Sequence, residues 1–539
     1  MKHKDRSKNI SLFTGCRWVL IFLCVPTIWA PSTWAANPRS AVEPPGDTIS
    51  MDDYFLTLIE QHPVFQFEEN RELIEIEQRE SYLGDKDWNV SADVSVAQFQ
   101  AVQASDSPYE VDQFSVGVGL NRAVWQTGGR VALRWDQGNN QLNYPAWQSN
   151  FFLPSNRAYE QVVSLNYIHP LLRNRAGILD RTDYEAAEFS VKLAAVFARE
   201  QEEQFLLSAG LAFINWTLLE ERLHIFDRRM QLSDEQIIRI RKKRAANLVD
   251  KVDVLRAEDS RRNTEQNRAL TQARRDSQRR TLAELAAHPQ LVVLKPTLAL
   301  YQTQRLPMAD STKDFIKSAS RTAISFTFQQ NELDRRKLSV ADQNKADLSL
   351  VFGVALKGGG DESQDSFNLN KEDASIGLRF SKPFGNRQAK HQLQKVTLQL
   401  HDLTLQRQRA LIDLQSQTVG LLTELKSMDA LLHLNQQQIH SAKQTTAEEW
   451  QLYNQGRNDL ATVILSQDRE QLARLTYAQN SASYQRLLLQ LKALLDSLVL
   501  EPTSYTNPQK TNPFSNSKTN VDIAAVLVRG EQQIDGEQQ

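Results

Sequence analysis

Cysteine is almost absent from this chain of 539 residues. Its two cysteines, Cys16 and Cys24, both lie close to the N-terminus. A chain that lost this segment would have neither a disulfide nor a thiolate metal site, even in an oxidising compartment. The sequence also lacks an HExxH metal motif and any readable Ser-His-Asp or Cys-His set. We therefore expect a protein that is not an enzyme and that uses no cofactor or metal.

Long apolar runs and an excess of one charge are missing as well. Beyond the N-terminal segment, no stretch reaches the roughly 18 uninterrupted apolar residues that a membrane-spanning helix requires. The 63 Lys and Arg residues nearly balance the 65 Asp and Glu residues, so the composition does not suggest nucleic acid as a partner. An exported chain without a spanning helix is either soluble or crosses a membrane as a closed barrel.

The first 35 residues have the pattern of a secretory signal. Five basic residues precede a short apolar core at residues 19–25, and small residues near Ala35 suit cleavage. This core is too short to span a bilayer. The segment holds five basic residues and one acid, Asp5, so its removal takes the formal net charge from −2 to −6. We expect export from the cytoplasm.

The rest of the chain contains one pattern twice. A helix, a set of strands and two very long helices follow one another from about Ser50 to Pro289, and again from about Ala323 to Leu500. An internal repeat of this kind reports the architecture directly. We expect a signal at 1–35, a first repeat at 36–289, a linker at 290–322, a second repeat at 323–500 and a low-complexity tail at 501–539.

Each repeat contains a long stretch without proline. Residues 176–246 and 387–455 each cover about 70 positions, and one helix of that length measures roughly 105 Å. Asn247 and Gly456, which tolerate a left-handed backbone, end these stretches. Returning helices are expected at about 251–287 and 460–498, so each repeat should form a helical hairpin. A shorter, capped helix is expected from Ser50 to about Tyr82.

Alternating apolar and polar residues predict the strands. We expect strands near residues 88–96 and 163–168 in the first repeat, and at 348–356 and 374–380 in the second. Four strands cannot close a barrel, but three chains would supply twelve. The further strands at about 114–137 are expected as an extracellular hairpin extension; the alternative places them in the wall and gives eighteen strands. The fold class is therefore a mixed α/β membrane protein, with a trimeric β-barrel continued by a long helical barrel.

Several segments resemble the TolC-like outer-membrane efflux proteins. The resemblance is carried by residues 453–456, 463–467 and 252–257, by the strand-to-helix junctions at Pro170 and Pro383, and by His62-Pro63 in the first helix. It covers nearly the whole chain beyond the signal. It implies a homotrimer in outer-membrane lipid that extends into the periplasm of a Gram-negative-type cell. It also implies docking to a periplasmic adaptor and to an inner-membrane pump or ABC exporter.

The resemblance further implies a gate at the periplasmic helix tips. The matching residues are Asp253 and Tyr453, with Arg457 next to the family's basic position, which is Asn458 here; Asn247 and Gly456 mark the tips. The family's acidic ring has no counterpart, because the matching positions are Thr462 and Leu465. Asp253 could instead be a solvated helix charge.

Asp250 and Asp459 begin the two returning helices at equivalent positions. A carboxylate there accepts hydrogen bonds from free backbone N–H groups, so both are candidate helix caps, with pore selectivity as the alternative. The function expected is the exit duct of an efflux or type I secretion system. The alternative is an exported trimeric coiled-coil tether without a pore.

Overall fold

The computed structural model describes residues 48–100, 108, 110–144 and 156–499. The contacts divide the chain after Pro45, and all the described residues belong to the second unit, residues 46–539. The expected signal at 1–35 and tail at 501–539 lie outside the described residues.

The first helical segment begins as its sequence predicts but is broken once. Helix α1 (Met51–Gln61) has a capping box, in which Asp53 N donates to Ser50 Oγ at 3.1 Å and Ser50 N donates to Asp53 Oδ2 at 3.3 Å. A second helix, α2 (Pro63–Ser81), follows instead of one continuous helix to Tyr82. The break lies at His62 because the residue before a proline avoids the helical conformation.

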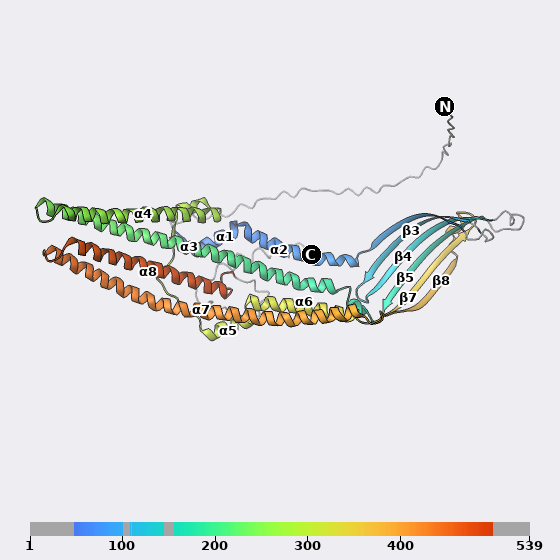
Figure 1. Ribbon diagram of the computed structural model, residues 1–539. Helices are drawn as coiled ribbons and strands as arrows, with labels where there is room; N and C mark the ends of the chain where they lie inside the picture. Colours follow the sequence, from blue (N-terminus) through green and yellow to red (C-terminus); the bar gives the residue numbers. More distant parts are fainter. Residues whose placement is uncertain (1–47, 101–107, 109, 145–155, 500–539) are drawn as a thin grey trace, which may run out of the picture. The chain divides into compact units, whose positions relative to one another are not determined.

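The sheet has six strands, and all neighbours are antiparallel: β2 (Asn89–Gln100), β3 (Glu110–Val124), β4 (Gly129–Asn143), β5 (Arg157–Pro170), β7 (Asp347–Gly360) and β8 (Lys371–Ser381). They lie in the order β2-β3-β4-β5-β7-β8, and Figure 1 shows β3 to β8 side by side. The expectation of about four wall strands is therefore wrong. β3 and β4 are not a separate extension, because they pair along their lengths with β2 and β5.

The two faces of this sheet differ in polarity. Side chains alternate between the faces, so each register row belongs to one face. One row is wholly apolar across all six strands: Val90, Leu120, Leu133, Leu165, Val354 and Ala374. The adjacent row lies on the opposite face and is polar or small: Ser91, Gly119, Arg134, Ser164, Ala355 and Asp373. A single apolar face thus runs from one edge of the sheet to the other.

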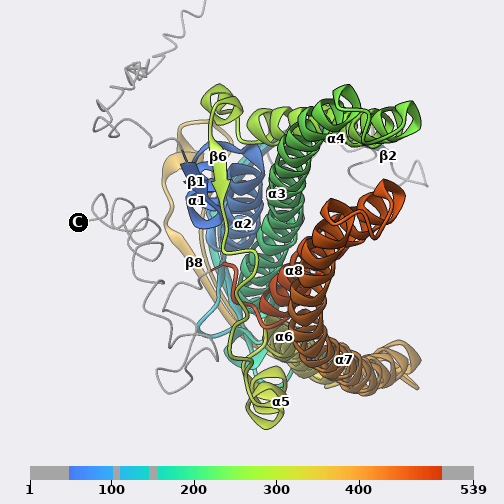
Figure 2. The same ribbon diagram turned by 90° about the vertical axis from the view of Figure 1, so that its left-hand side faces the viewer.

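Two long helices leave the sheet. Helix α3 (Thr182–Ala245) begins after β5 and α7 (Arg387–Asn454) begins after β8; they measure about 96 and 102 Å. The returning helices α4 (Lys251–Leu285) and α8 (Leu460–Leu494) are half as long. Near the sheet, α2 and α6 (Arg321–Gln343) complete the layer, in the order α2-α3-α6-α7. Towards the tips the order becomes α4-α3-α8-α7, as Figure 2 shows.

The largest apolar core lies where the helix order changes from α2-α3-α6-α7 to α4-α3-α8-α7. Tyr54 of α1 packs on Phe213 of α3, whose ring meets Trp216 edge to face. Residues of the expected linker cross here: α5 (Ala309–Ser318) and β6 (Lys295–Thr297), which pairs with β1 (Thr48–Ser50) in parallel. Among the described residues, none of the helices combines the length and apolar composition that a bilayer-crossing helix requires.

Candidate functional site

The two hairpin turns are built alike. Asn247 and Gly456 have positive φ angles of 58° and 72°. In the first turn Leu248 N donates to Lys243 O at 2.9 Å, and in the second Arg457 N donates to Leu452 O, also at 2.9 Å. These six-to-one bonds define a Schellman ending, which a left-handed residue makes possible. Asn247 and Gly456 therefore form the tips of the α3–α4 and α7–α8 hairpins.

The two aspartates that follow the turns behave differently. Asp459 caps α8, because its carboxylate accepts from Thr462 N at 2.9 Å and from Thr462 Oγ1 at 2.7 Å. These bonds hold the pKa of Asp459 below its usual range, with the Arg256 charge adding to the effect. Asp250 occupies the same position before α4, but its expected side-chain cap is not formed. Three residues after Asp459, Thr462 donates hydrogen bonds to it. Three residues after Asp250 stands Asp253, whose carboxylate repels that of Asp250 instead.

Tyr453 lies in an apolar cluster where all four long helices meet near the tips. Its neighbours there are buried residues of α3, α4 and α8: Ile237, Ile240, Ala257, Leu460 and Val463. The Lys243 ammonium lies 4.2 Å from the centre of the Tyr453 ring, a cation–π distance. The buried Tyr453 hydroxyl has no hydrogen-bond partner within the described part of the chain. Burial, and then the charge of Asp253, raise the pKa of this phenol.

The basic partner of Asp253 is Arg256 rather than Arg457. Arg256 Nη1 lies 3.7 Å from Asp253 Oδ1 on the same helix. Arg457 is exposed, and no ion pair joins it to Asp253 or Tyr453 in the described residues. The structure therefore brings Tyr453 and Asp253 into electrostatic contact but leaves Arg457 at the tip surface. The three-residue spacing of Asp253 and Arg256, one helical turn, was a usable signal for this pair.

Arg229 ties the two hairpins together further from the tips. Its guanidinium is buried, with 5 % of the side chain exposed. Nη1 donates to Gln467 Oε1 at 2.6 Å, and Nη2 donates to Asp468 Oδ1 at 2.8 Å and to Ser260 Oγ at 3.2 Å. One side chain of α3 thus binds α8 and α4. Sequence reasoning missed it, because Arg229 and Gln467 are 238 positions apart.

One acidic group among the described residues has carboxylates close enough to share a cation: Glu200, Glu203 and Asp496. Arg321, 1 % exposed, forms ion pairs with all three. The group is therefore a buried ion-pair network that joins α3, α6 and the end of α8. Burial raises the pKa of Glu203 to about 7, although the Arg321 charge opposes this shift.

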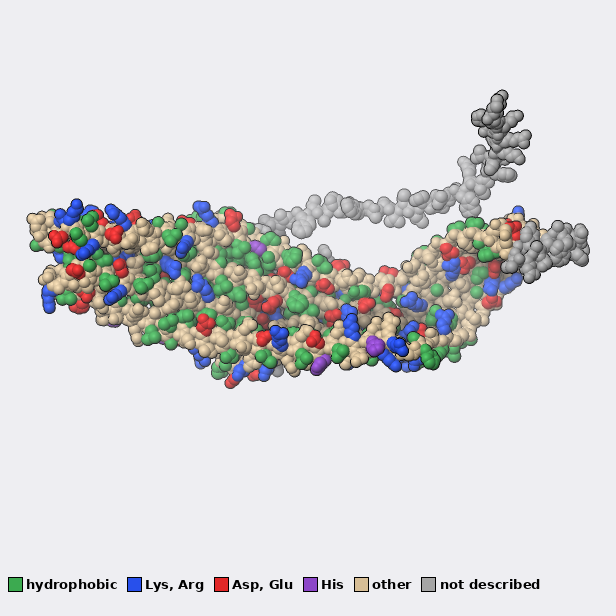
Figure 3. All heavy atoms as spheres, in the orientation of Figure 1, with side chains coloured by type: hydrophobic (Ala, Val, Ile, Leu, Met, Phe, Trp, Pro, Cys, Tyr) green, Lys and Arg blue, Asp and Glu red, His purple; other side chains and the backbone are tan. Residues whose placement is uncertain are grey.

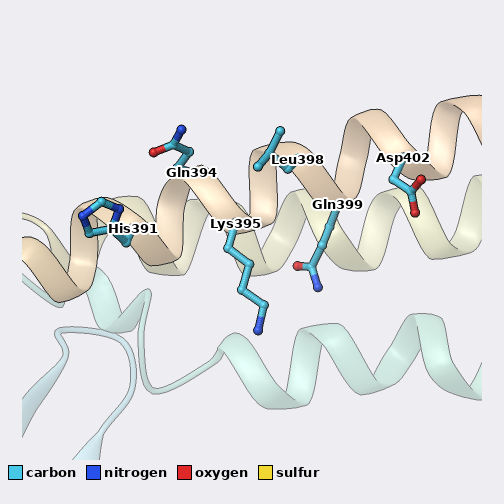
Figure 4. A pocket seen from close by; sticks show the side chains of 6 residues that line it. All are labelled: His391, Gln394, Lys395, Leu398, Gln399 and Asp402. Atoms are coloured by element: carbon cyan, nitrogen blue, oxygen red, sulfur yellow. The ribbon is translucent and has the colours of Figure 1, made fainter.

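Two surface depressions are each lined by a single helix. One depression of about 430 Å³ is lined by α7 alone, and Figure 4 shows its six residues along this helix: His391, Gln394, Lys395, Leu398, Gln399 and Asp402. A similar depression on α2 is lined by Asn70, Leu73, Ile74, Glu77 and Gln78. Acidic and basic side chains are interspersed on the helices in Figure 3. These one-helix grooves suit a packed neighbouring helix better than a small ligand.

No family model matches the sequence, and no curated protein matches it. Solved structures do match its fold. The outer-membrane channel OprN has a TM-score of 0.60 at 12 % identity, over 83 % of this chain and 90 % of that chain. VceC of Vibrio cholerae has a TM-score of 0.57 at 13 % identity, over 83 % and 95 %. The open state of MtrE of Neisseria gonorrhoeae has a TM-score of 0.58 at 12 % identity, over 83 % and 88 %.

The chain therefore has the fold of these outer-membrane channels, with long helices and one antiparallel sheet. The fold class predicted from the sequence is confirmed, with six strands in place of about four.

Proposed function

We propose that three copies of this chain form a channel through the outer membrane, which serves as the exit duct for an inner-membrane transporter. One observation carries the proposal: the six-stranded sheet has a continuous apolar face, and its edge strands β2 and β8 have no further strand partner among the described residues. An unpaired edge presents a row of free N–H and C=O groups, which cannot remain unsatisfied in lipid.

The strand directions allow closure by identical copies. β2 leaves the helical layer after α2, and β8 returns to it before α7. The strand direction alternates regularly from β2 to β8 across the sheet. β8 of one copy can therefore pair with β2 of the next in antiparallel fashion. Six strands are too few for a barrel, since about eight is the practical minimum. Three copies supply eighteen, a number typical of barrels with an aqueous channel.

The helical layer has matching free edges. On the half of α7 nearer the sheet, four exposed apolar residues recur every seven positions: Leu398, Leu405, Ile412 and Val419. On α2 the exposed residues Phe67 and Ile74 are also seven apart. A seven-residue repeat is the seam of helices that pack side by side. The groove on α7 carries Lys395 and Asp402, and the groove on α2 carries Glu77, so Lys395 of one copy can pair with Glu77 of the next. A heterologous contact that repeats around a ring satisfies both edges.

The two regions then have separate roles. The apolar face of the sheet contacts outer-membrane lipid, and the polar face lines the channel. The helices extend into the periplasm with Asn247 and Gly456 at their far end. That end would meet a periplasmic adaptor and an inner-membrane pump or ABC exporter. The assignment is supported by the similar structures, since OprN and MtrE are outer-membrane channels and VceC is an outer-membrane protein.

The cluster at the tips is proposed as the gate. Tyr453 and Asp253 lie where all four long helices meet, and Lys243 and Arg256 supply the positive charges beside them. Opening requires the α7–α8 hairpin to move relative to α3 and α4. In this proposal Arg457 is an exposed tip residue that can contact a neighbouring copy.

Two adjacent residues of β8 test the channel assignment. Ile376 lies on the apolar face with 70 % of its surface exposed. Gly377 lies on the polar face with open space around its Cα. Arginine on a lipid-facing barrel position costs about 2–4 kcal/mol near the bilayer centre and less near its surfaces. Ile376→Arg should therefore reduce membrane assembly strongly, whereas Gly377→Arg should not.

The measurement is the amount of protein in outer-membrane fractions, followed by conductance of the purified protein in planar bilayers. The proposal expects conducting pores from the wild type and from Gly377→Arg. Equal membrane assembly of both variants, or trimers that never conduct, would instead support the tether.

A further inference from the structure

Six charged residues on the polar face of the sheet gather in a narrow belt, while Arg130, Asp347 and Arg379 lie on the same face nearer the helices. Two consecutive polar register rows contain three acids and three bases: Asp93, Asp136, Asp373, Arg134, Lys357 and Lys371. The next polar row towards the helices has no charged residue: Asn89, Asn121, Ala132, Asn166, Gly353 and Ser375. The next row away from the helices contributes only Glu160. We name the six charged residues the polar belt; its formal charge is zero.

Arg134 binds two carboxylates of the polar belt. Its Nε donates to Asp136 Oδ1 at 2.8 Å and to Oδ2 at 3.0 Å. Its Nη2 donates to Asp93 Oδ1 at 2.8 Å and to Oδ2 at 3.0 Å. Fork-shaped contacts of this kind fix the plane of a guanidinium. One arginine therefore neutralises one of two carboxylates on strands that are not neighbours.

Glycine makes this bridge across β3 possible. Gly117 lies between Asp93 and Asp136 in the register. A Cβ at Gly117 would collide with Arg134 Nη2 and would lie 2.7 Å from Asp136 Oδ1 and 3.0 Å from Asp93 Oδ1. The missing side chain lets Arg134 lie flat against the sheet instead of projecting from it.

The other bases of the polar belt lie on β7 and β8. Lys357 Nζ lies 2.6 Å from Asp373 Oδ2, and Lys371 is opposite Lys357 in the register. The β2–β4 part of the belt thus has one net negative charge, and the β7–β8 part has one net positive charge. In a closed ring of three copies these parts would alternate around the channel.

We propose that Arg134, held across Gly117 between Asp93 and Asp136, sets the ion selectivity of the channel at the level of the polar belt. The inference rests on the proposed channel function and adds a specificity-determining residue to it. The belt is balanced while Arg134 is present, so the wild-type belt favours neither sign. Without Arg134 each copy gains one uncompensated negative charge, and a channel lined with carboxylates attracts cations.

The experiment measures the cation-to-anion permeability ratio of the purified channel in planar bilayers under a KCl gradient. At 0.01–0.03 M salt the Debye length is roughly 20–30 Å, so three added charges should raise the ratio about twofold. Arg134→Gln should show this rise, and the rise should shrink at 1 M salt. Arg134→Lys keeps the charge and should match the wild type. Asp93→Asn should shift the ratio towards anions.

Arg122 provides the matched control. It lies on β3 in a row of the apolar face, with its guanidinium 5.7 Å from the centre of the Trp88 ring. Arg122→Gln removes the same charge outside the channel and should leave the ratio unchanged. An unchanged ratio in both Arg134→Gln and Asp93→Asn pores would overturn the inference while leaving the channel intact. Absence of any wild-type conductance would refute the channel function itself. Should Arg134→Gln fail to assemble, Asp93→Asn alone decides the question.

Discussion

Replacing Arg229 with alanine should loosen the closed arrangement of the hairpins. Arg229 lies on α3, and its bonds to Gln467 and Asp468 reach α8 of the second hairpin. Its bond to Ser260 stays within the first hairpin and does not couple the two. If opening separates α8 from α3, only the first two bonds are lost on opening.

The size of the effect follows from the burial of these groups. A hydrogen bond with a charged donor contributes about 1.5–3 kcal/mol when it is buried, as the bond to Gln467 is. Asp468 is half exposed, with 53 % of its side chain accessible, so its ion pair adds at most about 1 kcal/mol. A coupling of about 2–3 kcal/mol corresponds to a shift of roughly 30- to 150-fold in the closed-to-open ratio.

Single-channel recording in planar bilayers measures that ratio. Arg229→Ala should raise the open fraction, whereas Arg228→Ala should not, because Arg228 is the adjacent exposed arginine and, within the described part of the chain, its side chain bonds to Gln231 on its own helix alone. A double variant that also removes Gln467 should add little to Arg229→Ala. Equal open fractions in the two arginine variants would refute the idea that this bond set holds the hairpins closed.

Three further outcomes are expected. Asp253→Ala should raise the open-to-closed ratio about fivefold or more in bilayers, because a lost carboxylate interaction is worth about 1 kcal/mol or more; the same change at Asp250 is the control, and equal effects would exclude a gate role. Asp459→Ala should lower the free energy of unfolding by about 1 kcal/mol and speed amide exchange in the first turn of α8. Asp250→Ala should leave the stability of α4 almost unchanged, because no cap bond is lost. Equal losses of stability in the two variants would contradict the difference in capping. The pKa of Glu203 is raised to about 7, so the folded state binds the proton of this carboxyl more tightly than the unfolded state does. Its contribution to stability therefore grows as pH falls from about 7 towards 4.5 and is lost as pH rises through 7. In thermal melts, Glu203→Gln should gain less stability between pH 7.5 and 5.5 than the wild type, and an identical gain would refute the assignment.

Local chemistry determined which parts of the fold the sequence could predict. The two long helices followed from the absence of proline over about 70 residues. Their ends followed from Asn247 and Gly456, since few other residues accept a left-handed backbone. Each of these predictions depends only on residues next to one another in the chain.

The errors arose where the outcome depended on pairing or on one neighbour. Alternation revealed β3 and β4, but it does not tell which strands they pair with, so their place in the sheet was missed. Asp250 and Asp459 match in position, yet only Asp459 has a hydroxyl donor three residues later. Arg229 could not be found at all, because its partners are brought near only by the packing of α3 on α8.

The number of chains in the assembled protein tests the central claim most directly. Both free edges of the sheet and both free edges of the helical layer are satisfied only if identical copies close into a ring. The mass of the detergent-solubilised wild type, corrected for bound detergent, should equal three chains. A stable monomer whose β2 and β8 amides are protected from exchange would contradict the account, because its edges would then be satisfied without a partner.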